Sequence, residues 1–177
     1  MPTEPRLCIP RPRARGLLGL ARRLWTAPTS VLGYLLASLL GCGRGERVGG
    51  EAVCAWLYRL PEGRMRGLGA IAIGHVIIVE PRFLAGREAW VLAHELSHAR
   101  QHDWLGPTYL LVHLVLQLVS ALASLGRRRS GFPPQHAYNP LERGFLCVPF
   151  DVLTLPQAPV GVQASQVLRA FGLAGPA

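Results

Sequence analysis

The chain has 177 residues, half of them hydrophobic, and a formal net charge of +9 whose positive residues are all arginine. This length fits one domain with an appended segment, and Cys8, Cys42, Cys54 and Cys147 show neither metal-finger spacing nor a disulfide framework. The arginines cluster beside apolar stretches without a nucleic-acid-binding motif, which disfavours nucleic acid as a partner and favours positive charge flanking a membrane.

The first 43 residues predict a basic lead followed by an apolar helix. Residues 1–23 are rich in Pro and Arg, residues 24–43 carry no charge, and Thr26-Ala27-Pro28 offers a helix start. This order is typical of a signal anchor, and Leu39-Leu40-Gly41-Cys42 loosely resembles a lipoprotein cleavage box. The apolar core is short for a membrane span, so a helix buried in a compact fold is the alternative. We therefore divide the chain into a membrane-associated segment, 1–43, and a domain, 44–177.

Two segments predict a small antiparallel sheet. After a Gly-rich loop at 44–50, residues 51–60 are rich in strand formers and precede the turn signal Pro61-Glu62-Gly63. Residues 69–80 are dominated by β-branched side chains, and we expect them to form one strand, bulged at Gly74.

The rest of the chain predicts helices. One runs from about Gly86 to Leu105, where Gly106-Pro107 ends it, and the uncharged residues 104–126 predict a long apolar helix. Asn139-Pro140 predicts the start of a short helix, because Asn caps well and Pro fits the first turn. A last helix is expected from Gln163 to Phe171.

An H-E-x-x-H motif, His94-Glu95-Leu96-Ser97-His98, lies within the helix predicted for 86–105. Residues four apart lie on one helix face, so both imidazoles can reach one metal ion. Glu95 lies beside that face, where it can accept a proton from a water whose pKa zinc lowers from about 15.7 to about 7. The motif predicts zinc bound by His94 and His98 with Glu95 as the base; a surface helix with solvated histidines is the alternative.

A catalytic zinc site needs a third protein ligand. Trp104 occupies the position six residues after the second histidine, and His102 lies too far along the helix to share the ion. Glu142, one turn into the helix that starts at Asn139, is a candidate, but Asn139 and Glu142 also form a capping pair that needs no metal. The spacing alone leaves both roles of Glu142 open.

The motifs resemble those of a group of small bacterial proteins. The stretch 94–101, Leu105-Gly106-Pro107 and Tyr138-Asn139-Pro140-Leu141-Glu142-Arg143 look like the H-E-x-x-H-x-x-Q, Gly-Pro and N-P-x-E motifs of that group, over roughly residues 69–145. The group is similar to the minimal gluzincins, which are compact zinc metallopeptidases. The resemblance implies an α+β, zincin-like fold in which His94, His98 and Glu142 bind zinc and Glu95 is the catalytic base.

In such a fold, the strand at 69–80 borders the cleft, and an extended peptide could pair with its edge. A donor aimed at the developing oxyanion is also expected, and His75, His136 and Tyr138 are candidates that equally fit structural roles.

Residues 108–125 are almost long enough to cross a bilayer, at about 27 Å. One crossing would place His98 and Glu142 on opposite sides, where they could not share an ion. His113 and Gln117, four residues apart, would form a polar stripe facing lipid. We therefore expect this helix not to cross.

Together, these features predict a zinc-dependent peptidase that acts on a peptide or protein substrate and is associated with the bacterial inner membrane. The alternative is a non-catalytic membrane-associated protein whose metal site is structural or vestigial.

Overall fold

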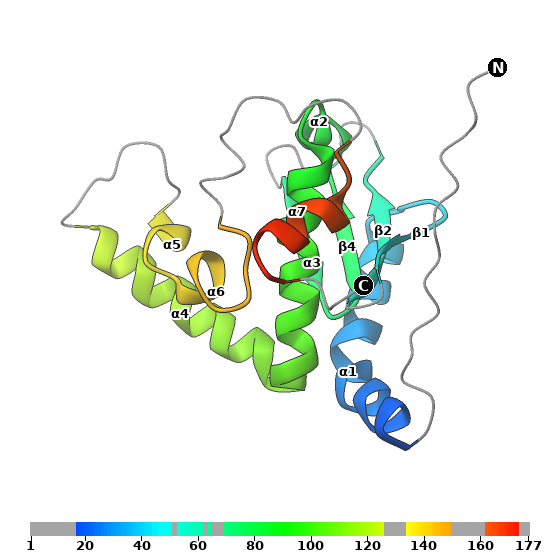
Figure 1. The fold of residues 1–177 in the computed structure, drawn as a ribbon, viewed down its shortest axis with the longest axis horizontal. Helices are drawn as coiled ribbons and strands as arrows, with labels where there is room; N and C mark the ends of the chain where they lie inside the picture. Colours follow the sequence, from blue (N-terminus) through cyan, green and yellow to red (C-terminus); the bar gives the residue numbers. More distant parts are fainter. Residues whose placement is uncertain are drawn as a thin grey trace.

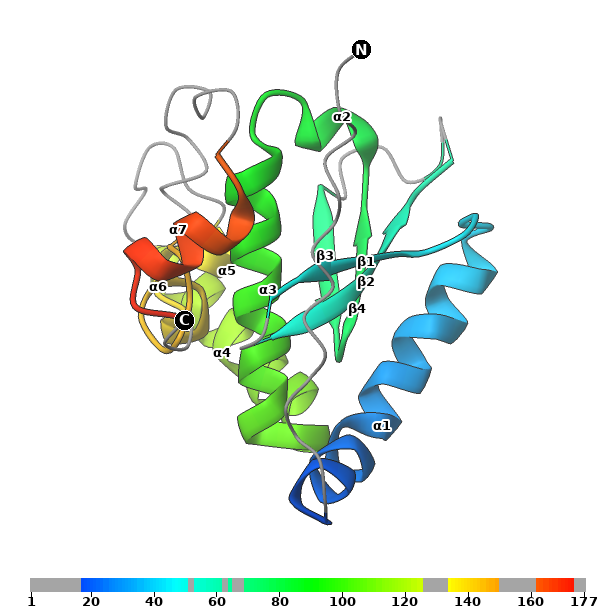
Figure 2. The ribbon, with the colours of Figure 1, turned by 45° about the vertical axis from the view of Figure 1, so that its right-hand side comes forward.

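The fold is α+β, as the sequence predicts, and a small sheet lies between two long helices, α1 (Leu17–Leu39) and α3 (Glu88–Leu105) (Figure 1). Figure 2 shows these helices on opposite sides of the sheet. The structure is a computed structural model. The residues that it describes are 17–50, 53–61, 64, 69–125, 134–149 and 162–173.

The sheet is built from two hairpins and has the strand order β1-β2-β4-β3. Its strands are β1 (Glu46–Gly49), β2 (Cys54–Arg59), β3 (Ala70–Ile73) and β4 (Val76–Val79). The pairs β1–β2 and β3–β4 are antiparallel, but β2 and β4 run parallel. The sheet is therefore mixed, and the prediction of an antiparallel sheet is wrong in this respect.

Residues 69–80 account for the difference, because they form two strands rather than one bulged strand. Gly74 has a φ of +63° and forms a two-residue turn with His75, so that Ile73 pairs with Val76. This turn reverses the chain and leaves β4 parallel to β2. All four residues of β4 are buried, which suits a strand at the centre of a sheet.

The Gly-rich segment 44–50, predicted as a loop, contributes the edge strand β1. Its backbone groups pair with β2 in a register that places Glu46 opposite Leu57. Pairing with a neighbouring strand outweighs the weak local strand preference of this segment.

The sheet separates two hydrophobic cores. Successive residues of β4 point to opposite faces: Ile77 packs in the core that contains Leu96 of α3, whereas Ile78 packs in the core that contains Ala37 of α1. The strands therefore hold α3, which carries the H-E-x-x-H motif, against one face of the sheet.

Helix α1 begins before its predicted start, and Pro28 lies inside it. A proline removes one intrahelical hydrogen bond, but packing against the sheet stabilises the helix across that position. Beside the proline, Thr29 Oγ1 donates to the Thr26 carbonyl at 2.9 Å. Residues 1–16 of the predicted basic lead lie outside the described residues.

The predicted later helices are confirmed. The C-cap of α3 is Gly106, whose φ is +56°, and a Cβ there would overlap the Trp25 indole of α1. The predicted helices that follow are α4 (Tyr109–Ser124), α6 (Pro140–Arg143) and α7 (Ala164–Ala170). Further short elements are α2 (Pro81–Leu84), the 3₁₀ turn η1 (Gly106–Thr108) and α5 (Pro134–Ala137).

Candidate metal centre

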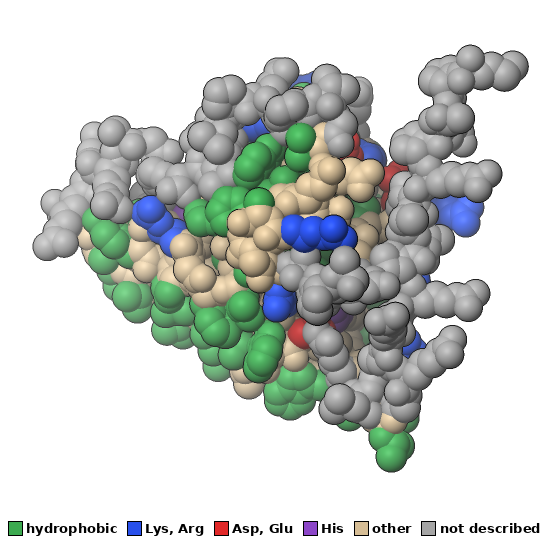
Figure 3. All heavy atoms as spheres, in the orientation of Figure 1, with side chains coloured by type: hydrophobic (Ala, Val, Ile, Leu, Met, Phe, Trp, Pro, Cys, Tyr) green, Lys and Arg blue, Asp and Glu red, His purple; other side chains and the backbone are tan. Residues whose placement is uncertain are grey.

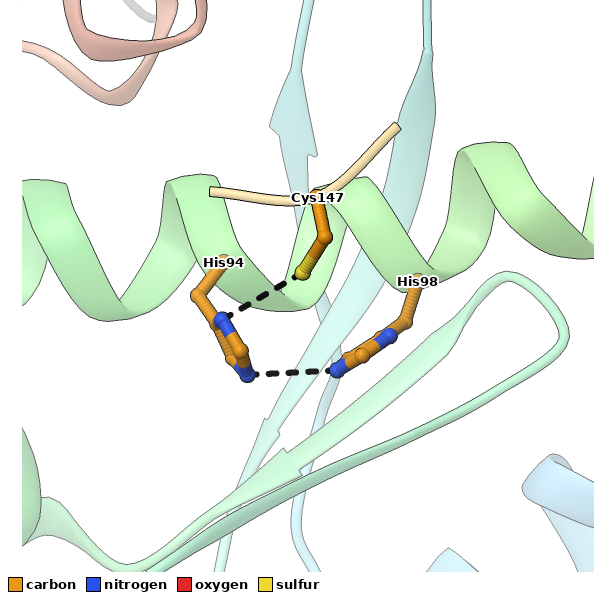
Figure 4. Close-up of side chains that lie close together, drawn as sticks. All are labelled: His94, His98 and Cys147. Atoms are coloured by element: carbon orange, nitrogen blue, oxygen red, sulfur yellow. Dashed lines mark hydrogen bonds between the residues drawn. The ribbon is translucent and has the colours of Figure 1, made fainter. Parts of the chain in front are cut away.

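Helix α3 presents the two motif histidines side by side inside the protein. His94 is 3% exposed and His98 is 5% exposed, and their Nε2 atoms lie 3.2 Å apart (Figure 4). The rings are nearly perpendicular, with an interplanar angle of 83°. The spacing of four residues therefore places both Nε2 atoms at one point beside α3.

Helix α6 brings Glu142 to the same point. Asn139 Oδ1 accepts a hydrogen bond from the Leu141 N–H at 2.9 Å and caps the helix, while the Glu142 carboxylate points toward the histidines. Glu142 Oε2 lies 3.2 Å from His94 Nε2 and 3.4 Å from His98 Nε2. Asn139 therefore caps the helix through its own side chain, and the Glu142 carboxylate is available to the histidines.

The three atoms form a triangle whose size suits a metal ion. Its edges, which join His94 Nε2, His98 Nε2 and Glu142 Oε2, measure 3.2, 3.2 and 3.4 Å. Ligand atoms bound tetrahedrally at zinc distances of about 2.0–2.1 Å lie about 3.3 Å from one another.

The neighbours of the two histidines leave both Nε2 lone pairs directed into this triangle. Gln101 Nε2 donates to the carbonyls of Leu141, at 2.8 Å, and Phe145, so Gln101 Oε1 is the atom 2.9 Å from His98 Nδ1. An oxygen there can only accept, and His98 Nδ1 must carry the proton. The Val148 carbonyl, 2.7 Å away, fixes His94 Nδ1 in the same way. Such partners are typical of histidines that bind metal through the other nitrogen.

Glu142 supplies the negative charge of the cluster. Burial alone would raise the pKa of its carboxyl, but hydrogen bonds from four histidines outweigh burial and hold that pKa well below its usual range. Oε2 is buried, and its neighbours are His94 Nε2 at 3.2 Å and His98 Nε2 at 3.4 Å. A buried carboxylate oxygen beside two imidazole nitrogens needs a positive charge next to it, which a metal ion or a proton on an imidazole can supply, so the residues present fit a metal ion.

Without a metal ion, a proton takes the place of that cation. Burial lowers the pKa of His98, but the nearby carboxylates of Glu142 and Glu95 outweigh burial and raise it to about 9. At neutral pH a metal ion must therefore displace a proton from His98.

Glu95 is buried beside the two ligands, at 5% exposed. Burial raises the pKa of its carboxyl above the usual value, and the charges of His94 and His98 oppose that rise. A carboxylate with a raised pKa is a suitable base at neutral pH.

The other oxygen of Glu142 contacts a second pair of histidines. Oε1 lies 3.2 Å from His113 Nε2 on α4 and 3.2 Å from His136 Nδ1 on α5. Tyr109 Oη lies 3.0 Å from both His98 Nδ1 and His113 Nδ1, so it links the two pairs. The carboxylate is therefore held from both sides.

Cys147 lies close to both motif histidines and approaches His94 at its Nδ1 atom (Figure 4). Its Sγ is 3.6 Å from His94 Nδ1 and 3.3 Å from the Val148 carbonyl, and burial raises its pKa well above the usual value. Cys147 is therefore a free, buried thiol. The buried cluster of His94, His98, Cys147 and Glu142 can hold a metal ion.

The structure separates the three candidate oxyanion donors. His136 contacts Glu142, and Tyr138 follows it, half-buried, with its backbone N–H bonded to Ser120 Oγ at 2.8 Å. His75 lies in the β3–β4 turn, with its Nε2 3.1 Å from Asp103 Oδ1. Asp103 follows His98 by five residues on α3, more than one helical turn along its axis, and the described side-chain contacts of His75 are with Asp103 and Ser30 and not with the cluster.

His102 is a neighbour of the site, as the sequence predicts, and not part of the triangle. Its Nε2 accepts a hydrogen bond from the Gly74 N–H at 3.0 Å, and its ring packs against Tyr109 at an interplanar angle of 43°. Burial, together with nearby histidines, lowers the pKa of His102 to about 3 and keeps the ring neutral.

Sequence reasoning missed the contribution of α4 to the site. Tyr109, His113 and Gln117 recur every fourth residue, so they form one polar stripe on an otherwise apolar helix, and this stripe faces Glu142 and His98. That spacing was visible in the sequence, but only the fold shows which neighbour the stripe faces.

The chain matches no protein-family model, and no significant match is found among curated proteins or solved structures.

Proposed function

We propose that this protein is a zinc-dependent peptidase of zincin-like architecture, with zinc held by His94, His98 and Glu142. The observation that carries the proposal is the triangle of 3.2–3.4 Å formed by their three ligand atoms. Two imidazoles and one carboxylate are a donor set of catalytic zinc sites, in which the fourth position stays open for water or substrate. When bound, zinc would lower the pKa of a water molecule and polarise the scissile carbonyl.

Glu95 is the proposed general base. It follows a ligand directly on α3 and is buried beside both histidines, and its pKa is raised by burial. It would take a proton from the attacking water and pass it to the leaving amine of the peptide.

His113 and His136 position the third ligand in this proposal. Both approach Glu142 Oε1 to 3.2 Å, so they would hold the carboxylate with Oε2 toward the motif histidines. The segment that carries His136 and Tyr138 is also the proposed source of an oxyanion donor, since it lies next to the cluster.

An edge of the sheet offers a binding mode for the substrate. β3 is at the end of the strand order and packs beside α3. An extended peptide can add to such an edge through backbone hydrogen bonds, which accommodates many sequences.

A structural metal site is the second candidate function, and burial favours it. His94, His98 and Glu142 are all at most 5% exposed, and Cys147 lies beside His94 as a potential fourth ligand. Structural zinc sites are closed in this manner, whereas catalytic sites keep an open position.

An experiment on wild type and the Glu95→Gln variant distinguishes the peptidase from the structural metal site. It measures the zinc content and the peptidase activity of both proteins. Glu95→Gln keeps the size of the side chain and removes the base, so the peptidase proposal requires retained zinc with loss of casein hydrolysis. A zinc-loaded wild type that hydrolyses neither casein nor a peptide library would support the structural site.

A further inference from the structure

Helix α4 has its polar and apolar faces in the opposite arrangement to that of a helix on the surface of a soluble protein. Its polar stripe of Tyr109, His113 and Gln117 faces inward to the metal centre. Its outward residues are apolar, follow a helical spacing and are between 49% and 82% exposed: Leu111, Leu114, Val115, Leu118, Val119, Leu122 and Leu125. Figure 3 shows hydrophobic side chains gathered along the lower edge of the molecule, over α4.

Exposed apolar side chains also lie on the first turns of α1, which contact η1. Trp25 of α1 packs against Gly106, and Trp25 and Trp104 are 47% and 66% exposed. Leu17, Leu20 and Leu24 are also exposed. Both views show the N-terminal end of α1 beside the junction of α3 and α4 (Figure 1, Figure 2). We call the outer residues of α4 together with these two tryptophans and three leucines the apolar face.

We propose that the apolar face docks in the plane of an anionic lipid bilayer, with α4 lying on the membrane rather than crossing it. The proposal is independent of peptidase activity, because it concerns the face of α4 opposite the metal centre.

Charge decides between lipid and a second copy of the chain. No charged residue occurs between Trp104 and Gly126, and in the sequence Arg22 and Arg23 belong to α1 while Arg127–Arg129 follow α4. Basic residues that flank an apolar helix in the sequence suit an anionic lipid surface. Two copies, each with a net charge of +9, would instead repel one another. Exposed tryptophans in such a face suit the headgroup region of a bilayer.

Geometry decides between lying on the membrane and crossing it. The stretch Glu88–Ser124 is long and apolar enough to cross by length and composition. However, the exposed strip from Leu111 to Leu125 is only about 21 Å long, short of a hydrocarbon core of about 30 Å. A crossing would also place His113 and Gln117 at membrane depth and separate His98 from Glu142.

Co-flotation of the full chain with vesicles tests the proposal. We expect binding to phosphatidylglycerol-containing vesicles, weaker binding to pure phosphatidylcholine and a decrease at high salt. The double variant Leu114→Gln/Leu118→Gln should lower the partition coefficient by about tenfold or more, because two exposed leucines lose their burial in lipid. Trp104→Gln should also weaken binding, whereas its matched control Trp56→Gln, an exposed tryptophan on β2, should not.

Circular dichroism and zinc content would show that the variants fold, and Leu111→Gln/Leu122→Gln is a second variant on the same face. Unchanged partitioning of both double variants would overturn the proposal. Protein that remains in vesicles after carbonate extraction would overturn it in favour of a spanning helix. A vesicle-independent dimer that the double variants dissociate would overturn it in favour of a second copy.

Discussion

His94 Nε2 and His98 Nε2 face each other at 3.2 Å, while each Nδ1 lies against an oxygen acceptor. Two Nε2 lone pairs cannot face each other at this distance in a buried site, so either a metal ion or a proton on one imidazole must lie between them. Glu142 Oε2 closes the triangle, so the arrangement has the charge and size of a metal site before any ion is considered.

The first prediction concerns metal content. Wild-type protein should contain about one zinc ion per chain, and Glu142→Ala or His98→Ala should reduce occupancy strongly, because a structural or catalytic zinc site needs at least three protein ligands. Elemental analysis after dialysis measures this. His75→Asn is the control, since His75 pairs with Asp103 and should leave zinc content unchanged. Full occupancy in Glu142→Ala would remove Glu142 from the ligand set.

The second prediction concerns Gln101. Gln101→Ala should lower zinc affinity by about 10–100-fold, because it removes the acceptor for His98 Nδ1 and the donor to Leu141 and Phe145 at the end of α6. Competition with a chromophoric chelator measures the affinity. Gln117→Ala is the matched control: Gln117 contacts His113, which is not in the triangle, and the loss should be smaller. If the two variants lost zinc affinity equally, the contacts of Gln101 would not orient His98 as a ligand.

The parts of the site that are local in the chain could be predicted from the sequence. The spacing of His94 and His98 fixes their relation on any helix, and Asn139-Pro140 predicts the start of α6 from capping chemistry alone. Glu142 is different, because its distance from His94 depends on how α4 turns the chain back. The sequence spacing therefore left open whether Glu142 is a capping partner or a metal ligand, and only the resemblance to the gluzincins favoured a ligand.

The parts that depend on tertiary pairing could not be predicted. Gly74 within a β-branched run is compatible with both a bulge and a hairpin, and the choice depends on which strands pair. The segment 44–50 has little strand preference until β2 provides its partner. Cys147 has no local signal for the site, and the polar spacing of His113 and Gln117 does not say which neighbour they face, so packing alone brings Cys147 to His94 and His113 to Glu142.

The third prediction concerns two glycines with positive φ. Gly74→Ala should destabilise the fold by about 2 kcal/mol or more, because the left-handed backbone disfavours a Cβ and that Cβ would meet Ser30 on α1. Gly172→Ala has the same backbone strain, with φ of +65°, but nothing lies within 4 Å, so it should cost about 1 kcal/mol. Urea unfolding followed by circular dichroism measures both. If Gly172→Ala lowered the free energy of unfolding as much as Gly74→Ala does, the contact of the new Cβ with α1 would add nothing to the destabilisation at Gly74.

The final prediction concerns the pH dependence of zinc binding. The carboxylates raise the pKa of His98 to about 9 despite its burial, so the metal-free protein holds a proton there at neutral pH, and zinc must displace it. Apparent zinc affinity should therefore rise by about tenfold per pH unit between about pH 6 and about pH 8, and level off above the pKa of His98. Chelator competition across this range measures the slope. Glu95→Gln removes a carboxylate that raises the pKa of His98, so it should move the levelling point to lower pH. An affinity that is flat over the range would mean that His98 is neutral in the metal-free protein, and an unchanged levelling point in Glu95→Gln would mean that Glu95 does not act on His98.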